Sequence, residues 1–405
     1  MGKPKIRFKG YTEDWEQREL EDFGKATGGT SIESEFSEDG IYKVISIGSY
    51  SENSVYNDQG IRAIKSDKTS NRVLNRNDLT MILNDKTTSG NIIGRVLLIE
   101  ESGIYVYNQR TERIEINLDE YDPVFLYEML NAPNIREKII KQAQGNTQIY
   151  VNWTAISLLE YMIPSKEEQV KIGEYLHSIS NLITLHQRKR EETKKLKKYM
   201  LQKMFPQNGQ TVPEIRFAGF TEDWEQRELG DIITEYKETV DSDCILPILT
   251  SSKTEGVILQ EEHFGRKQQH DITGYNILPR NYCTYRNRSD GVDFTFNINK
   301  CCDKGIISKF YPVFSGKNSD VFFLSLVLNN SEEVVREIAY TCTGTGQKVL
   351  SFLDLQKMKV RVPNFDEQKE IAAYFEALAH LITLHQKKCE ELQKIKKFML
   401  QNMFV

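Results

Sequence analysis

The stretch GYTEDWEQREL, from Gly10 to Leu20, occurs a second time as GFTEDWEQREL, from Gly219 to Leu229. The copy extends on both sides, because residues 6–22 and 215–231 differ at only three of seventeen positions. A shared local structure would reproduce a pattern of apolar residues, but not a charged, Trp-centred string residue by residue. The chain therefore contains an internal repeat, and this repeat is the first feature that its architecture must explain.

A second block is also repeated. LITLHQRKREETKKLKKYMLQKMF begins at Leu182, and LITLHQKKCEELQKIKKFMLQNMF begins at Leu381. These blocks lie 199 residues apart, whereas the openings lie 209 apart, so the segments between them differ in length as well as in sequence. Each half thus consists of a near-invariant opening, a variable body and a near-invariant closing segment.

The closing segments carry the signals of a helix start. Pro164 and Pro363 end the preceding strand or loop. The residues Ser165-x-x-Glu168 and Asn364-x-x-Glu367 then fit a capping box, in which side chain and backbone satisfy each other's free N–H groups. We therefore expect a helix to begin at each of these points.

Both helices have the periodicity of a coiled coil. From Ile172 to Met204 and from Ile371 to Met403, residues of one row recur at alternating spacings of four and three. At 1.5 Å per residue, each helix is about 58 Å long. One long helix from each half needs a partner, so we expect the two to pack antiparallel about a pseudo-two-fold axis. That arrangement places His186 near Cys389 and Arg190 near His385.

Composition sets the broad class. The 405 residues are 39% hydrophobic and 27% charged, as in ordinary globular proteins, and no apolar run is long enough to span a membrane. All six cysteines lie in the second half without a CxxC pair, which favours reduced thiols in the cytoplasm. A net charge of −5 argues against a uniformly basic surface, so any nucleic-acid binding must come from local patches or a basic partner.

The variable bodies mix strand and helix signals. YKVISIGSY (42–50) and NIIGRVLLIE (91–100) are rich in β-branched and aromatic residues. Residues 122–143 and 319–339 have helical periodicity. We predict an α+β chain with two mixed α/β domains joined by two long antiparallel helices, which form a coiled coil and give the repeat its pseudo-two-fold symmetry.

The order of these parts resembles one family over essentially the whole chain, the specificity (S) subunits of type I restriction–modification systems. Two variable bodies, a repeated W-E-Q-R-E-L and a repeated helix beginning with P-x-x-x-E-Q carry the resemblance. KATGGTS (25–31) also looks like the Gly-Gly-Thr turn common in the first recognition domain, and the second body lacks it. The resemblance implies these domains: target recognition domains at 1–163 and 215–362, a central repeated helix with linker at 164–214, and a C-terminal repeated helix at 363–405.

The resemblance also implies a function. The chain would be the DNA-recognition subunit of a bacterial, cytoplasmic type I restriction–modification complex, with each recognition domain reading one half of a bipartite double-stranded DNA site. The repeated helices would space the domains and dock two methyltransferase (M) subunits, and restriction (R) subunits would join the complex. The chain itself would hold no cofactor. S-adenosylmethionine would belong to the methyltransferase partner, and ATP and Mg²⁺ to the restriction partner.

The residues themselves predict no catalytic or metal site. The chain has no Asn/Asp-Pro-Pro-aromatic tetrapeptide of an adenine methyltransferase, and TGTGQK (343–348) lacks the spacing of a phosphate-binding loop. Asp354, Glu367 and Lys369 imitate a nuclease pattern, but the first half has Val170 where the lysine falls. We therefore expect a non-catalytic subunit.

Polar loops are the candidate DNA readers. Arg can pair with guanine and Asn or Gln with adenine, whereas Lys, Ser and Thr mostly hold phosphates. In the first body these residues are Lys86, Thr87, Thr88, Ser89, Asn91 and Arg95, with Asn146, Thr147 and Gln148. In the second they are Arg266, Lys267, Gln268, Gln269, Tyr285, Arg286, Asn287, Arg288 and Ser289, with Thr345, Gln347 and Lys348. For each single residue, a merely solvent-exposed loop remains an equal alternative.

A second hypothesis is a bivalent protein-binding scaffold, with two adaptor domains on a coiled coil and no role with nucleic acid. The modest acidity of the chain favours it slightly. Binding of duplex DNA by the chain together with its methyltransferase partner separates the two hypotheses.

Overall fold

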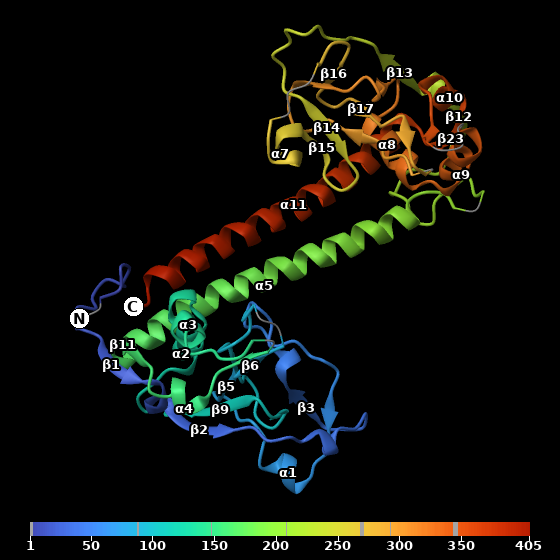
Figure 1. Cartoon of the computed structure of the whole chain (residues 1–405). Coiled ribbons are helices and arrows are strands. Elements are labelled where there is room, and N and C mark those ends of the chain that lie inside the picture. Colours follow the sequence, from blue (N-terminus) through green and yellow to red (C-terminus); the bar gives the residue numbers. More distant parts are fainter. Residues whose placement is uncertain are drawn as a thin grey trace. The chain divides into compact units, whose positions relative to one another are not determined.

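The computed structural model describes residues 3–86, 89–146, 148–207, 209–267, 271–291, 293–342 and 347–405. The chain divides into two compact units: the first unit comprises residues 1–188 and 386–405, and the second unit comprises residues 189–385. Two 38-residue helices, α5 (Lys166–Lys203) and α11 (Phe365–Asn402), each contribute to both units (Figure 1). The mixture of helices and strands confirms the predicted α+β class.

The first unit is built on an antiparallel sheet in the order β2-β9-β5-β7, beside a three-stranded sheet in the order β4-β3-β8. Its strands are β1 (Glu16–Glu19), β2 (Gly24–Gly28), β3 (Tyr42–Ile45), β4 (Arg62–Ala63), β5 (Leu79–Ile82), β6 (Asn84–Asp85), β7 (Val96–Leu98), β8 (Tyr105–Tyr107), β9 (Thr111–Ile116), β10 (Ile149–Tyr150) and β11 (Glu160–Ile163). Its shorter helices are η1 (Leu20–Phe23), η2 (Glu33–Glu35), η3 (Ile47–Ser49), α1 (Asp67–Ser70), α2 (Pro123–Asn131), α3 (Pro133–Ile140) and α4 (Trp153–Ile156).

The second unit repeats this plan with a four-stranded sheet in the order β13-β21-β17-β19. Its strands are β12 (Glu225–Glu228), β13 (Ile233–Tyr236), β14 (Leu249–Ser252), β15 (Gly256–Leu259), β16 (Asn276–Pro279), β17 (Cys283–Thr284), β18 (Arg288–Ser289), β19 (Asn297–Ile298), β20 (Lys304–Ile307), β21 (Val313–Gly316), β22 (Lys348–Val349) and β23 (Lys359–Val362). Its shorter helices are α6 (Leu229–Ile232), α7 (Gln260–Phe264), α8 (Val321–Asn330), α9 (Glu332–Thr341) and α10 (Phe352–Lys357).

The repeated opening string forms the strand that precedes each body. In the first unit, EQRE of β1 pairs antiparallel with β11, the strand that leads into α5. In the second unit, the same four letters form β12, which pairs with β23 just before α11. The opening of each half is therefore hydrogen-bonded to the strand that leads into its closing helix. This pairing explains why the opening and the closing segment are repeated together.

The tryptophan of the opening lies in an aromatic cluster. Trp15 packs edge-on against Phe125 of α2, and Phe125 packs against Phe404, two residues after the end of α11. In the second unit, Trp224 packs in the same way against Phe323 of α8 and against Phe205 at the end of α5. Each unit thus encloses the Met-Phe end of the helix that begins in the other half of the sequence.

This exchange of helix ends confirms the antiparallel pairing. In the first unit, the end of α11 lies on the start of α5, and the Cys389 thiol donates to the Ile183 carbonyl over 3.7 Å. In the second unit, the end of α5 packs with the start of α11. Every member of the two predicted seam rows is buried or half-buried, as the 3.5-residue period requires.

The glutamates at the helix starts have a different role from the expected one. Glu168 accepts two hydrogen bonds of 2.7 Å from Arg7, and Glu367 accepts the same pair from Arg216. The Asn364 side chain does cap the Glu367 N–H, but the reciprocal bond of a capping box is replaced by the arginine. The capping-box prediction for Glu168 and Glu367 is therefore wrong. A bidentate pair with a nearly unexposed carboxylate instead ties each opening to its helix.

The next residue in each helix joins it to the body. The Gln169 amide donates to the Pro164 carbonyl, and its oxygen accepts the Asp122 N–H at the start of α2. Gln368 makes the equivalent bonds with Pro363 and with Asp320 at the start of α8. The Glu and Gln of the repeated P-x-x-x-E-Q thus link the long helix to the opening and to the body through hydrogen bonds. In the described ranges, no helix combines the length and apolarity that crossing a lipid bilayer requires.

Candidate nucleic-acid interface

Two predicted polar segments of the first unit meet in a two-stranded ribbon. β6, at the start of the 84–95 loop, pairs antiparallel with β10, which follows the GNTQ segment (145–148). The sequence alone treats these segments separately, since 49 residues lie between them. The structure therefore gathers two of the predicted DNA-reading segments at one place.

A buried arginine of α3 holds the backbone of the second half of this loop, at Gly90 and Ile93. Arg136 of α3 is buried and donates to the carbonyls of Gly90 and Ile93 over 2.5 and 2.8 Å. Burial lowers the pKa of Arg136 to about 10. Sequence reasoning missed this residue, because nothing in the local pattern of α3 marks an arginine that points inward.

The predicted residues of the first unit fall into two groups. Side chains that face solvent are Lys86, Ser89, Asn91, Asn146 and Gln148. Arg95 is half-buried instead, donating to Ser54 Oγ and to the Asn91 carbonyl, and burial lowers its pKa. Arg95 therefore supports the loop from inside. The predicted residues Thr87, Thr88 and Thr147 lie outside the described residues.

The second unit has the same kind of ribbon. β18, within the YRNRSDG segment, pairs antiparallel with β22, which contains Lys348. The Asn287 backbone extends the ribbon, because its carbonyl accepts from the Leu350 N–H and its N–H donates to the Phe310 carbonyl. Both ribbons occupy the same place in the topology. The first strand follows the third strand of the four-stranded sheet, and the second precedes a short helix and the strand that leads into a long helix.

Tyr285 is a correction to the predicted set. Its ring is fully buried in the core, and its hydroxyl donates to the Leu350 carbonyl over 3.2 Å. A direct DNA contact needs an accessible polar atom, so Tyr285 supports the ribbon from within the unit. Its position directly after β17, whose two residues are themselves buried, explains the inward orientation.

Two arginines dominate the exposed surface of this ribbon. Arg286 and Arg288 are exposed, and the Arg288 guanidinium lies 4.5 Å from the centre of the Phe310 ring. They line a hollow of about 380 Å³ together with Asp290 and Asp293. Ser289 donates to Asp293, and Gln347 donates to Asp290. Asp290 and Asp293 thus hold the polar side chains of Gln347 and Ser289, whereas Arg286 and Arg288 are exposed.

The FGRKQQH segment stands apart from the ribbon. Arg266 and Lys267 are exposed just after α7, and Lys267 lines a different hollow of about 470 Å³ beside Pro247 and Gln260. The predicted residues Gln268, Gln269 and Thr345 lie outside the described residues. The structure thus separates this segment from the two that form the β18–β22 ribbon.

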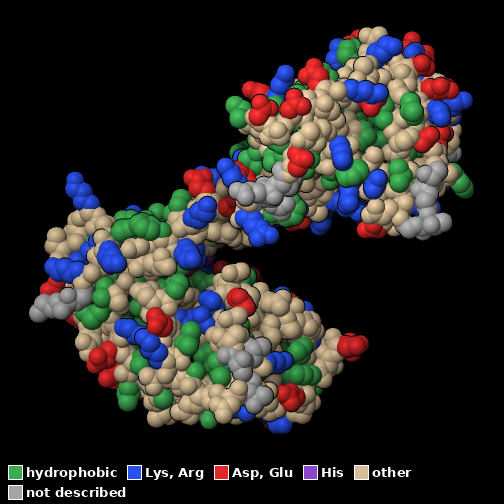
Figure 2. All heavy atoms as spheres, turned by 45° about the horizontal axis from the view of Figure 1, so that its top comes forward, with side chains coloured by type: hydrophobic (Ala, Val, Ile, Leu, Met, Phe, Trp, Pro, Cys, Tyr) green, Lys and Arg blue, Asp and Glu red, His purple; other side chains and the backbone are tan. Residues whose placement is uncertain are grey.

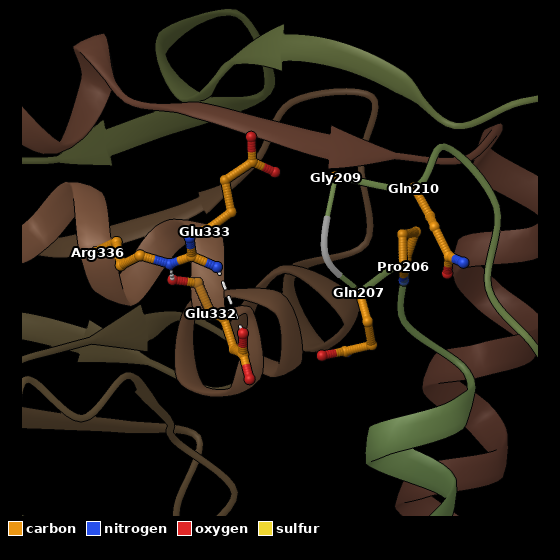
Figure 3. Close-up of a pocket in the computed structure, with 7 residues that line it drawn as sticks. All are labelled: Pro206, Gln207, Gly209, Gln210, Glu332, Glu333 and Arg336. Carbon is orange, nitrogen blue, oxygen red and sulfur yellow. Dashed lines mark hydrogen bonds and ion pairs between the residues drawn. The ribbon is translucent and has the colours of Figure 1, made fainter.

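Charged side chains of both signs are mixed on the surface of the two units. On the face drawn in Figure 2, Lys and Arg side chains are interspersed with Asp and Glu side chains in both units. Among the described residues, no three His, Cys, Asp or Glu side chains gather where they could hold a metal ion. Another hollow of the second unit, about 490 Å³, lies between the loop after α5 and the start of α9 (Figure 3). It is lined by Glu332, Glu333 and Arg336 and lies away from the predicted readers.

Comparisons with known proteins identify the family of the chain. The family model described as the type I restriction modification DNA specificity domain matches residues 12–195 and again 221–394. The chain belongs to this family. The two matches begin 209 residues apart and end 199 apart, which are the two offsets of the internal repeat. The family resemblance of the repeated opening and helices is therefore confirmed.

Relatives cover most of the chain. The putative type I restriction enzyme MjaX specificity subunit of Methanocaldococcus jannaschii is 26% identical over 331 residues, 75% of this chain and 73% of that protein. The type I restriction enzyme MjaVIII specificity subunit of the same organism is 23% identical over 415 residues, 95% of this chain and 91% of that protein. The crystal structure of the S subunit of a type I restriction-modification system from M. genitalium has the same fold, with a TM-score of 0.64 at 15% identity over 100% of this chain and 99% of that one.

Proposed function

We propose that this family member reads a bipartite site on double-stranded DNA, with each unit recognising one half through its ribbon and the adjoining loop. The observation that carries the proposal is the recurrence of the ribbon. Both units place a two-stranded ribbon at the same point of the topology, but its side chains differ. The ion pairs that tie the opening to the long helix, Arg7–Glu168 and Arg216–Glu367, are the same in both units. A shared scaffold that carries ribbons with different side chains suits two half-sites of different sequence.

The ribbons have suitable dimensions and chemistry. A two-stranded β-ribbon fits the major groove of B-DNA, where all four base pairs can be distinguished. Exposed Arg286 and Arg288 can each donate two hydrogen bonds to guanine O6 and N7. In the first unit, Asn91 and Gln148 supply amides suited to adenine, and Lys86 supplies a charge for phosphate.

The long helices would dock two methyltransferase subunits. Leu182 and Leu185 are exposed on α5, and Leu381 and Leu384 are exposed at the equivalent places on α11. A second exposed pair recurs as Leu196 and Tyr199 on α5, and as Ile395 and Phe398 on α11. Repeated apolar surfaces suit two copies of one partner. The methyl donor S-adenosylmethionine would be held by these partners, and ATP with Mg²⁺ by restriction subunits, while this chain supplies recognition without catalysis.

A protein-binding scaffold is the competing function, and the modest net acidity of the chain, −5, favours it slightly. Duplex DNA binding of the chain, purified with its methyltransferase partner, separates the two. The proposal expects tight binding to a subset of sequences from a random duplex library, weakening as salt rises because phosphate contacts release counterions. Retention of partner proteins with no preference among DNA sequences would favour the scaffold instead.

A further inference from the structure

One acidic side chain of the first unit lies where a charge is costly. Glu112, the second residue of β9, points to the same face of the sheet as Ile114 and Ile116, which belong to the core. The residue is 6% exposed. Among the described residues, none donates a hydrogen bond to its carboxylate or forms an ion pair with it. A buried carboxylate without a partner is unfavourable, so its presence needs a reason.

The carboxylate lies at a hollow that the ribbon helps to form. The hollow has a volume of about 430 Å³, and its lining includes Asn84 of β6 and Tyr150 of β10. The exposed end of Glu112 thus opens toward the surface that we propose to face DNA. Burial raises the pKa of this carboxyl to about 7, against the opposing effect of the Arg72 guanidinium.

Two glycines leave room above the carboxylate. Gly28 lies opposite Glu112 in the β2–β9 ladder, and a Cβ atom there would lie 3.3 Å from Glu112 Oε2. A Cβ atom on Gly29 would lie only 2.1 Å from the Asn108 carbonyl oxygen. Both glycines also line the hollow. The Gly-Gly pair of KATGGTS therefore keeps this hollow open and brings backbone and carboxylate to its surface.

The second unit has no equivalent acidic group. The β2–β9 ladder pairs Gly24 with Ile116, and the β13–β21 ladder pairs the matching Ile233 with Gly316. Continuing four residues along this register puts Lys237 in the place of Gly28 and Pro312 in the place of Glu112. The carboxylate belongs to the variable part of the molecule, as a group that distinguishes one half-site from the other should.

We propose that Glu112 accepts a hydrogen bond from the exocyclic amine of one base, cytosine N4 or adenine N6, in the half-site that the first unit reads. This inference rests on the proposed function. In its ionised form the Glu112 carboxylate only accepts hydrogen bonds and repels phosphate, so in that form its contact with DNA is with a donor on a base edge. In the major groove the exocyclic amines of cytosine and adenine are the donors, and acidic side chains pair with cytosine N4. Glu112 thereby acts in specificity and adds nothing to general affinity.

The test uses the complex of the full chain with its methyltransferase partner and a duplex library randomised over both half-sites. Glu112→Gln should reduce the preference at one base pair of one half-site by about five- to a hundredfold, leaving the other half-site unchanged. Gly28→Ala, which crowds the carboxylate without touching its charge, should weaken the same preference. Glu115→Gln is the matched control, because Glu115 lies on the same strand but is exposed.

Base analogues identify the donor. Duplexes with purine in place of adenine, or 2-pyrimidinone in place of cytosine, lack the exocyclic amine at that one base. They should weaken binding of the wild type and have little further effect on Glu112→Gln. The base whose analogue produces this result is the one that Glu112 reads.

Other outcomes distinguish a failure of the proposed role of Glu112 from a failure of the proposed DNA-reading function. Unchanged preferences in Glu112→Gln would overturn the role of Glu112 while leaving the proposed function intact. Equal weakening on all sequences would assign Glu112 a structural role, and a change confined to binding of a protein partner would place a basic protein side chain in the hollow. A wild-type complex without sequence preference would refute the proposed function itself.

Discussion

A buried ion pair that joins α11 to the rest of the first unit predicts that equivalent lysine substitutions will change the stability of the two units differently. The Lys396 ammonium lies 2.8 Å from Glu128 Oε2 and donates to Ser180 Oγ over 2.7 Å. The side chain of Glu128 is only 2% exposed. Replacing Lys396 with Met leaves this carboxylate buried without an ionic partner, with only the Ser180 hydroxyl still donating to it over 3.2 Å. Breaking a fully buried pair in this way costs about 3–5 kcal/mol. Because the Lys396 side chain is 22% exposed and water can reach it, we expect a loss of about 2–4 kcal/mol.

The repeat supplies the matched control. The equivalent lysine in the second unit is Lys197, and the positions of Glu128 and Ser180 are taken by Leu326 and Ala379. Among the described residues, Lys197 has no hydrogen-bonding or ionic partner, and burial lowers its pKa. Lys197→Met therefore removes a poorly solvated charge, so the second unit should keep its stability or gain about 1 kcal/mol.

Hydrogen exchange resolved along the chain measures each unit separately, which matters because a chain of two units does not unfold in one step. Protection should fall in α2 and the end of α11 for Lys396→Met and persist in α8 for Lys197→Met. The double variant Glu128→Leu, Lys396→Met copies the apolar surroundings of the second unit and should recover most of the loss. Equal losses from the two lysine variants, or no recovery in the double variant, would show that the buried Glu128–Lys396 pair does not distinguish the two units.

Three further predictions concern single residues. Since burial raises the pKa of Glu112 from 4.5 to about 7, the folded state binds its proton more tightly than the unfolded chain, and the free energy of unfolding falls as pH rises between those values. Urea titrations at pH 5 and pH 8 should show this fall, up to about 3 kcal/mol, in the unfolding step of the first unit of the wild type and not in Glu112→Gln. Arg286→Ala or Arg288→Ala should weaken recognition of one half-site only, by about 1–3 kcal/mol, in competition binding; a uniform loss across all sequences would identify phosphate contacts. Arg7→Met should destabilise the first unit by about 3 kcal/mol through unpaired Glu168, with exchange in the second unit unchanged.

The repeats and the long helices could be predicted because their signals are local and duplicated. A 3.5-residue period over some thirty residues fixes both the helix and the face it buries, and the two copies of one string identify the scaffold. The role of Glu168 could not be predicted in this way. Its partner Arg7 is 161 residues away, while the local Ser165-x-x-Glu168 pattern fits a capping box equally well.

The candidate site was predictable only in part. Polar loops could be found from composition, but their assembly into ribbons depends on pairing between residues as distant as Asp85 and Ile149. The loop interpretation also placed Tyr285 at the surface, since nothing beside it in the sequence shows that the core continues one residue past β17. Glu112 was missed because TERIEI reads as an ordinary alternating strand, and only the register identifies which face is buried.

We propose that the shared helical scaffold sets the spacing between half-sites while the variable units read the bases, and lengthening the scaffold tests both roles. Inserting one heptad after Gln187 and one after Gln386 keeps the 3.5-residue seam and lengthens both helices by about 10 Å, on the order of three base pairs. The longer spacing also turns one half-site by roughly 100° around the duplex, so methylation should weaken. The direct measurement is a map of methylated bases in cells that express this variant with its methyltransferase partner. We predict the same two half-sequences with a longer spacer; an unchanged spacer at full activity, or altered half-sequences, would contradict the claim.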